Sequence, residues 1–373
     1  MKLVFCKIIL ILTWAGFTFQ SEACRFTVRE IGFSVLSQTN YSLVVVDGSA
    51  SWNQSELKAM KEIARESNIQ ILLLDPEADA LNPLLTKAKE QRISFPNAFL
   101  CRPDKEIYPL FDSSSDYNRT TLKNLFTKEV IQSPVRKQLL EGIHNTFAYV
   151  ICIAGNDEVR NQKAKQCIEE ACKRVKDIMP LMPKEVENPP RILTLSAKDR
   201  VQERILLWSL GLDTQSDEPH TIVVYGRGRF MGSALSYEQI QEETVYRYLA
   251  MIGADCECNL DRKWMLGTQL PLLWDGKVRQ NLAKSLKFDV DNPSILAEMS
   301  RIMTKEVIAD NSSSASFAPE TIDLDEAFGY STDKPKAEVE EEADNTMIYI
   351  LFITLAVLLV VVALVSVVIL KKK

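Results

Sequence analysis

The chain has 373 residues, of which 46% are hydrophobic and 25% are charged, and this length suits about two ordinary globular domains. Its net charge is −6 and no basic stripe occurs, which argues against nucleic acid as a partner. The 8 cysteines are too few for a disulfide-dense scaffold, and the 2 histidines leave few routes to His-dependent catalysis.

The first segment is typical of a secretory signal peptide. Residues 1–23 combine a basic start, an apolar run that begins at Ile8, and small residues at Ser21 and Ala23 where a signal peptidase would cut. The apolar run is shorter than the roughly 20 residues that a spanning helix needs. Cleavage would make Cys24 the first mature residue, either as a structural thiol or, on a weaker sequence match, as an acylated cysteine.

Strand and helix patterns alternate in the first part of the body. Short β-branched apolar runs predict buried strands, helical periodicity predicts the segments between them, and Pro96 stands ahead of a strand, a tight turn and a returning strand. The predicted segments are strand 41–47, helix 55–67, strand 69–75, helix 82–91, the hairpin strands within 93–110, and helix 120–127.

The same order then recurs at a spacing of about 120 residues, which indicates an internal repeat. Pro219 takes the place of Pro96 ahead of the second hairpin. The predicted segments are strand 147–154, helix 161–178, strand 190–196, helix 201–210, the hairpin strands within 218–235, and helix 238–252.

This order, with Phe95–Pro96 and then Pro219 ahead of the hairpins, resembles the thioredoxin-like fold. In that family the proline is cis and faces the active loop, and a cis X-Pro bond is usually kept for a tight turn. The resemblance implies an α/β fold class with two tandem thioredoxin-like units, each a three-layer α/β/α arrangement. A generic α/β sandwich is the alternative, because right-handed βαβ units occur in many folds.

The catalytic motif of that family is missing from both units. A thiol–disulfide module needs Cys-x-x-Cys where the helix after the first strand begins, because the helix N-terminus lowers the thiol pKa. Residues 48–55 and 155–160 occupy these loops and contain no cysteine. Cys167 and Cys172 stand five apart on one predicted helix, so they do not share a face. The resemblance therefore implies redox-inactive domains, which usually serve for interaction or placement, and no cofactor.

Cys256 and Cys258 are the remaining chemical candidates. They favour a structural disulfide from one of them to Cys24 or another thiol, with a reducible redox pair or a soft-metal site as alternatives. Trp264 and Trp274 follow them and either cap a core, which is the favoured interpretation, or offer an aromatic anchor for a partner.

The C-terminal end is typical of a single membrane anchor. Residues 347–370 are long and apolar enough to span a bilayer, and three lysines follow at 371–373. Basic residues stay on the cytoplasmic side, so the body is expected to be extracytoplasmic, either periplasmic or extracellular. The acidic, Ser-rich segment before the helix is expected to be a flexible stalk.

These patterns predict a membrane-anchored extracytoplasmic binding or assembly protein with a protein partner, rather than an enzyme. The alternative is an atypical thiol–disulfide oxidoreductase or a metal-binding protein that uses Cys256 and Cys258. The predicted parts are a signal peptide 1–23, a first unit 24–135, a second unit 136–252, an extension 253–308, a stalk 309–346, a transmembrane helix 347–370 and a cytoplasmic tail 371–373.

Overall fold

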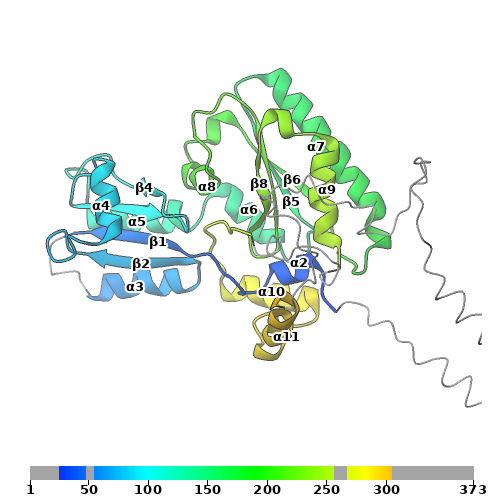
Figure 1. Cartoon of the computed structure of the whole chain (residues 1–373), viewed down its shortest axis with the longest axis horizontal. Helices are drawn as coiled ribbons and strands as arrows, with labels where there is room; N and C mark the ends of the chain where they lie inside the picture. The colour runs from blue at the N-terminus through cyan, green and yellow to red at the C-terminus, as the bar shows by residue number, and fades with distance from the viewer. Residues whose placement is uncertain (1–24, 48–53, 256–266, 305–373) are drawn as a thin grey trace, which may run out of the picture. The chain divides into compact units, whose positions relative to one another are not determined.

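The computed structural model describes residues 25–47, 54–255 and 267–304, and Figure 1 shows two sheets with their covering helices. Each sheet has four strands, in the orders β2-β1-β3-β4 and β6-β5-β7-β8. No helix within these ranges is long and apolar enough to cross a membrane. The predicted signal peptide, stalk, transmembrane helix and tail lie outside the described residues.

The first sheet is built around β1, which pairs parallel with β2 and antiparallel with β3. Its strands are β1 (Tyr41–Val46), β2 (Ile69–Leu74), β3 (Asn97–Cys101) and β4 (Ile107–Pro109). Its helices are α3 (Gln54–Arg65), α4 (Pro83–Glu90) and α5 (Arg119–Leu125), and a π-helical turn (Phe126–Val130) follows α5. The observed order agrees with the order predicted from the sequence.

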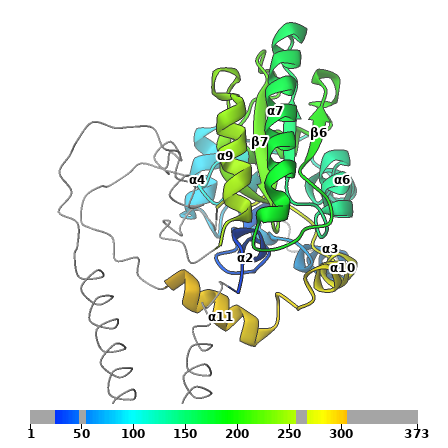
Figure 2. The ribbon, with the colours of Figure 1, turned by 90° about the vertical axis from the view of Figure 1, so that its right-hand side faces the viewer.

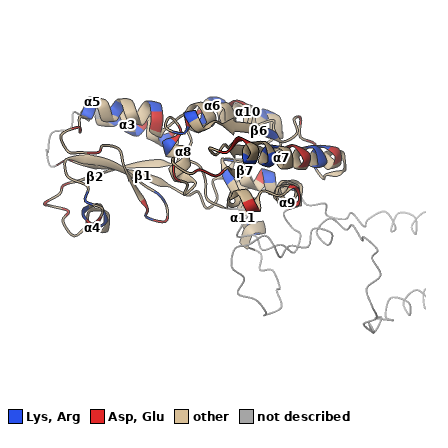
Figure 3. Cartoon of the chain, turned by 90° about the horizontal axis from the view of Figure 1, so that it is seen from above, with Lys and Arg blue, Asp and Glu red and all other residues tan. Residues whose placement is uncertain are grey.

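Both faces of this sheet are covered, which explains why β1 reads as a continuous apolar run. Residues of α3 and α5, including Met60 and Leu122, pack with Leu43 and Val45 on one face. Residues of α4 pack with Val44 on the other face. Figure 3 shows the same arrangement, with α4 on one side of the sheet and α3 and α5 on the opposite side. The first unit is therefore a three-layer α/β/α arrangement.

The second sheet repeats this plan with β5 at its centre, parallel to β6 and antiparallel to β7. Its strands are β5 (Tyr149–Ile153), β6 (Arg191–Leu195), β7 (His220–Tyr225) and β8 (Arg229–Leu235). Its helices are α6 (Pro134–Gly142), α7 (Glu158–Ile178), α8 (Arg204–Ser209) and α9 (Glu242–Gly253). The faces divide between α7 with α9 and α6 with α8. Figure 2 shows α7 and α9 side by side.

Segments from both sides of the repeat complete the second unit. Helix α2 (Val28–Gly32) packs Val28 and Ile31 into the core beneath α7 and α9. Leu270 and Leu272 enter the core beneath α6 and α8, together with residues of α10 (Gly276–Leu286). Helix α11 (Pro293–Thr304) returns to the α7–α9 side.

The observed boundaries between the two units therefore differ from the predicted ones. The N-terminal part of the expected first unit, 24–135, packs on the second core because α2 is apolar on the side that faces it. The expected junction between residues 135 and 136 falls inside α6, whose Val135 and Leu139 belong to the second core. The segment 267–304 is part of that same packed body.

Three buried arginines hold these added segments to the second unit. Arg29 donates to carbonyl oxygens within 143–147, and Arg229 donates to the carbonyl oxygens of Gly32, Ser34, Leu36 and Gly267. Arg136 connects the carbonyl oxygens of Glu129, Val130 and Pro271. Burial lowers the pKa of each guanidinium to about 10, so all three stay charged at neutral pH. Each charge is met by main-chain oxygens, which tie segments distant in sequence together.

Candidate functional site

The first candidate site lies at the carboxyl end of β1, where thioredoxin-like proteins carry their active loop. Val46, the last residue of β1, pairs with Asn97, so the end of β1 lies next to the Phe95–Pro96 bond. That bond is cis, as the sequence resemblance implied for Pro96. The side-chain amide of Asn97 donates to the carbonyl oxygens of Ser94 (3.3 Å) and Phe111 (3.2 Å), which holds the proline loop against the next turn. The loop 48–53 lies outside the described residues.

A charged pair marks this end of the sheet. Asp47 directly follows β1, and its side chain is only 11% exposed. Arg119 Nε lies 2.8 Å from Asp47 Oδ2, and the Tyr117 hydroxyl donates to the same oxygen at 3.1 Å. The hydrogen bond to Asp47 raises the pKa of Arg119, and burial together with the Asp47 carboxylate raises the pKa of Tyr117. This arrangement offers a partner a fixed ion pair and a phenol, and it places no thiol beside Pro96 among the described residues.

Asp47, Tyr117 and Arg119 are not among the site residues that the sequence predicts. The only signal is Asp47 itself, an acid at the carboxyl end of a predicted buried strand. Tyr117 and Arg119 lie about 70 residues further on, at the start of α5, and no local pattern joins them to Asp47.

The corresponding end of the second sheet is closed. The backbone N–H of Asn156 donates to the carbonyl oxygen of Asp217 at 2.9 Å, and Arg160 pairs with Glu218 at 2.8 Å. A Cβ placed on Gly155 would lie 2.3 Å from the Asp217 oxygen, far below any normal contact. The loop after β5 therefore packs directly on the segment before Pro219, which leaves no room for a reactive side chain at Gly155.

Two further features distinguish this end of the second sheet from the corresponding end of the first sheet. The Glu218–Pro219 bond is trans, so Pro219 heads β7 as predicted but lacks the cis geometry found at Pro96. Arg200, only 3% exposed, donates to the carbonyl oxygens of Ala154, Thr214 and Ser216 and so ties the end of β5 to the neighbouring loop. Burial lowers the pKa of Arg200. Its two terminal nitrogens donate to main-chain oxygens, and its buried Nε has no acceptor among the described residues.

The described thiols are poorly suited to nucleophilic chemistry. Cys101, Cys152 and Cys172 are buried, Cys167 is half-buried, and all four are free. Burial raises the pKa of Cys101 and Cys152, and it raises the pKa of Cys172 to about 12. Because the thiolate is the reactive form, Cys101, Cys152 and Cys172 are expected to be inert at neutral pH. Within the described ranges, no group of three or more His, Cys, Asp or Glu residues is placed to hold a metal ion.

Cys24, Cys256, Cys258 and Trp264 lie outside the described residues. Their flanking residues are described, however, because Thr27 and Asp255 form an antiparallel bridge and Val28 N donates to the Ala254 oxygen at 3.0 Å. The two chain segments that lead to these cysteines are therefore held together on the second unit.

Trp274 is not exposed as an aromatic anchor for a partner would be. Its side chain is 3% exposed and packs in the α6–α8 core beside Phe33. Arg227 lies over its ring at 4.9 Å and also pairs with Asp291 at 3.2 Å. The segment 267–274 crosses the second unit and turns this ring into the core.

No family model and no curated protein matches the chain. Among solved structures, ERdj5 in crystal form II is similar over 57% of this chain and 27% of its own, with 10% identity and a TM-score of 0.20. The first two thioredoxin domains of Naumovozyma dairenensis Eps1p match over 60% of this chain and 97% of theirs, with 10% identity and a TM-score of 0.19. Human ERp44 in its zinc-bound form matches over 62% of this chain and 61% of its own, with 11% identity and a TM-score of 0.20.

Both units are thioredoxin-like. The strand order, with a parallel βαβ unit followed by an antiparallel hairpin, is the same in the two sheets. The cis bond at Pro96 adds the local feature that the resemblance implied for the first unit. The comparisons have TM-scores of 0.19 to 0.20, so they carry no argument about this chain, and the assignment rests on its own strand order.

Proposed function

We propose that the protein is a membrane-anchored, extracytoplasmic binding or assembly protein whose thioredoxin-like units have lost redox activity. One observation carries this proposal: the loop after β5 is closed onto the segment before Pro219 through Gly155 and Asp217. A catalytic unit needs an accessible thiol at that loop, and neither loop sequence contains a cysteine.

The first unit supports the same role in a different way. Its cis Pro96 end remains flanked by the Asp47–Arg119 pair, a half-buried ion pair. Such a pair at the end of a rigid sheet can orient a partner without exchanging electrons with it. The membrane part of the proposal rests on the apolar sequence 347–370 and the lysines that follow it.

Disulfide turnover tests the redox part of this proposal. The full chain in detergent is mixed with insulin and dithiothreitol, and the rate of disulfide reduction is compared with reactions that contain no added protein and with an active thioredoxin. We expect the rate without added protein. A clear acceleration that disappears in Cys256→Ser would instead establish the oxidoreductase alternative.

Protease protection tests the anchor. In sealed right-side-out cells or vesicles, added protease should digest the body and leave a small fragment that contains the C-terminal lysines. Deletion of residues 347–370 should release the body into the soluble fraction. Retention of the deleted protein in the membrane would contradict the anchoring proposal.

A further inference from the structure

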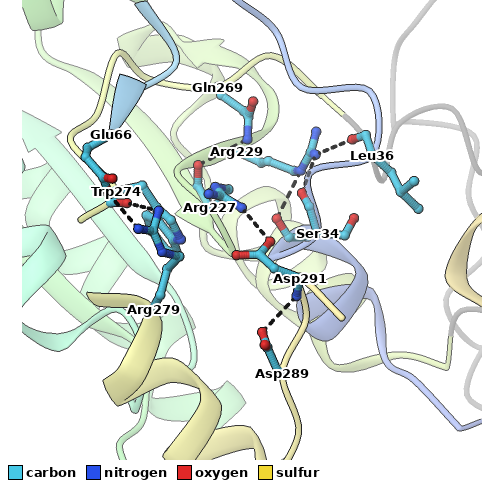
Figure 4. A network of polar contacts seen from close by, with 11 residues as sticks. Ser34, Leu36, Glu66, Arg227, Arg229, Gln269, Trp274, Arg279, Asp289 and Asp291 are labelled. Carbon is cyan, nitrogen blue, oxygen red and sulfur yellow. Dashed lines mark hydrogen bonds and ion pairs between the residues drawn. The ribbon is translucent and has the colours of Figure 1, made fainter. Parts of the chain in front are cut away.

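A cavity of about 350 Å³ lies away from both loop sites. Figure 4 shows part of its lining, namely Glu66, Arg227, Gln269, Trp274, Arg279 and Asp291. Its walls come from the C-terminal end of α3, the β7–β8 turn, the segment 269–274, and the region from α10 to the start of α11. Ligand pockets range from roughly 300 to 1,000 Å³, so this cavity suits a small ligand or the end of a chain.

The cavity carries one positive charge in excess. Arg65, Arg227 and Arg279 line it, together with two acids. Arg279 pairs with Glu66 at 2.7 Å, and Arg227 pairs with Asp291 at 3.2 Å. Arg65 is exposed and has no ion pair within the part of the chain that the structure describes. A bound monoanion would balance the charge.

Unused hydrogen-bond donors accompany this charge. Trp274 is almost fully buried, and its indole Nε1 has no hydrogen-bond acceptor among the described residues. Arg227 lies over the same ring and has one hydrogen bond to a side chain, the bond to Asp291. Asn68, by contrast, is fully engaged with main-chain groups of Thr39, Leu270 and Leu272. The Trp274 nitrogen is itself enclosed by the protein, so the charged donors that line the cavity are the guanidinium groups of Arg65, Arg227 and Arg279.

Uncharged residues complete the wall, and they include the polar side chains of Gln38, Ser67, Asn68 and Gln269. Val35, Leu270, Leu272 and Leu296 line the cavity beside the arginines. A ligand that fits both parts has an anionic head and a short apolar body. Carboxylates suit the head because guanidinium groups bind them through paired, planar hydrogen bonds. A phosphate dianion would leave the cavity with an excess of negative charge.

We propose that this cavity binds a carboxylate carried on an apolar group, as at the C-terminal residue of a peptide or in a free apolar acid. The inference deepens the proposed binding role and rests on it. It does not depend on whether the chain reduces disulfides, so the two proposals fail in different experiments.

Calorimetric titration of the full chain in detergent with N-acetyl-leucine tests the proposal, with N-acetyl-leucinamide as the uncharged probe. We expect the acid to bind and the amide to give no heat of binding. Equal affinity for acid and amide, equal affinity for inorganic phosphate, or no binding of the acid would each overturn the proposal. A peptide that ends in leucine distinguishes the two sources: tighter binding than N-acetyl-leucine indicates a chain end, and equal binding indicates a free acid.

Variants place the binding in this cavity. Arg65→Gln should weaken binding of N-acetyl-leucine by about tenfold or more, because it removes a charge-assisted contact, and Arg65→Lys should retain part of the affinity. Lys58→Gln is the matched control, because Lys58 is exposed on the same helix, carries the same charge and does not line the cavity. Unchanged affinity in Arg65→Gln would rule out this cavity as the binding site.

Discussion

Replacement of Arg229 by methionine is the sharpest test of how the second unit is held together. Arg229 is 0% exposed and donates to four carbonyl oxygens, those of Gly32 (3.0 Å), Ser34 (3.1 Å), Leu36 (2.6 Å) and Gly267 (3.2 Å). Methionine fills similar space but donates to none of them. The substitution therefore leaves main-chain oxygens unpaired in both the N-terminal segment and the segment before α10.

The magnitude follows from two opposing effects. A hydrogen bond to a charged group contributes roughly 1.5–3 kcal/mol, so the lost contacts sum to at least about 6 kcal/mol. Burial lowers the pKa of Arg229 from 12.5 to about 10, which corresponds to about 3 kcal/mol of unfavourable charge burial that methionine removes. We expect Arg229→Met to lower the free energy of unfolding by about 3 kcal/mol or more, a large part of the roughly 5–15 kcal/mol typical of a domain.

Urea denaturation of the full chain, followed by circular dichroism, measures this loss, and hydrogen exchange locates it. Exchange should accelerate in residues 33–36, whereas the β1–β3 core of the first unit should keep its protection. Arg301→Met is the control, because Arg301 is exposed on α11 and should change stability by no more than about 0.5 kcal/mol. If Arg229→Met is no more destabilising than Arg301→Met, the main-chain contacts do not hold these segments and the reasoning is refuted.

Three further predictions concern the backbone, a buried acid and the undescribed cysteines. Gly226→Ala should lower the free energy of unfolding by at least about 2 kcal/mol, because Gly226 has φ +53° and an added Cβ would lie 2.4 Å from the backbone of the α2 segment. Burial raises the pKa of Glu203 above its ordinary 4.5, so the folded state holds this proton more tightly than the unfolded state. The stability that Glu203 contributes is therefore present below pH 4.5 and lost as pH rises through the folded-state pKa, and Glu203→Gln should become more stable relative to the parent chain across that interval. Non-reducing mass spectrometry should find Cys24 joined to Cys256 or Cys258, because the bridge described above holds the adjoining chain segments together.

Each of these predictions has a matched comparison. Gly276→Ala should be nearly neutral, since no atom lies within 4 Å of a Cβ built there, and an equal loss at Gly226 and Gly276 would contradict the close-packing argument. A stability difference between Glu203→Gln and the parent chain that stays constant from pH 4 to pH 8 would show that the folded state does not perturb Glu203. Cys24 found as a free thiol or an acylated residue would exclude the proposed disulfide.

Local sequence patterns determined the regular elements of both sheets. A strand covered on two faces needs consecutive apolar residues, and the runs that became β1 and β5 have that composition. Pro96 and Pro219 marked the starts of the two hairpins, because proline restricts its own backbone and that of the preceding residue. The absence of cysteine from both loops is also a property of the sequence alone.

Tertiary structure decided which unit each flanking segment joins. Helix α2 precedes the first sheet in sequence, yet it packs in the core of the second unit, and the segment 267–304 does the same from the other end. Arg227 and Arg229 lie in the segment 218–235, for which the sequence predicts only a hairpin, but their partners lie in α2, the 33–36 segment and the loop before α11. Sequence periodicity reports burial only along one element, whereas these contacts join residues that are far apart in the chain. The ends of the second unit and the arginine-lined cavity therefore exist only once the chain has folded.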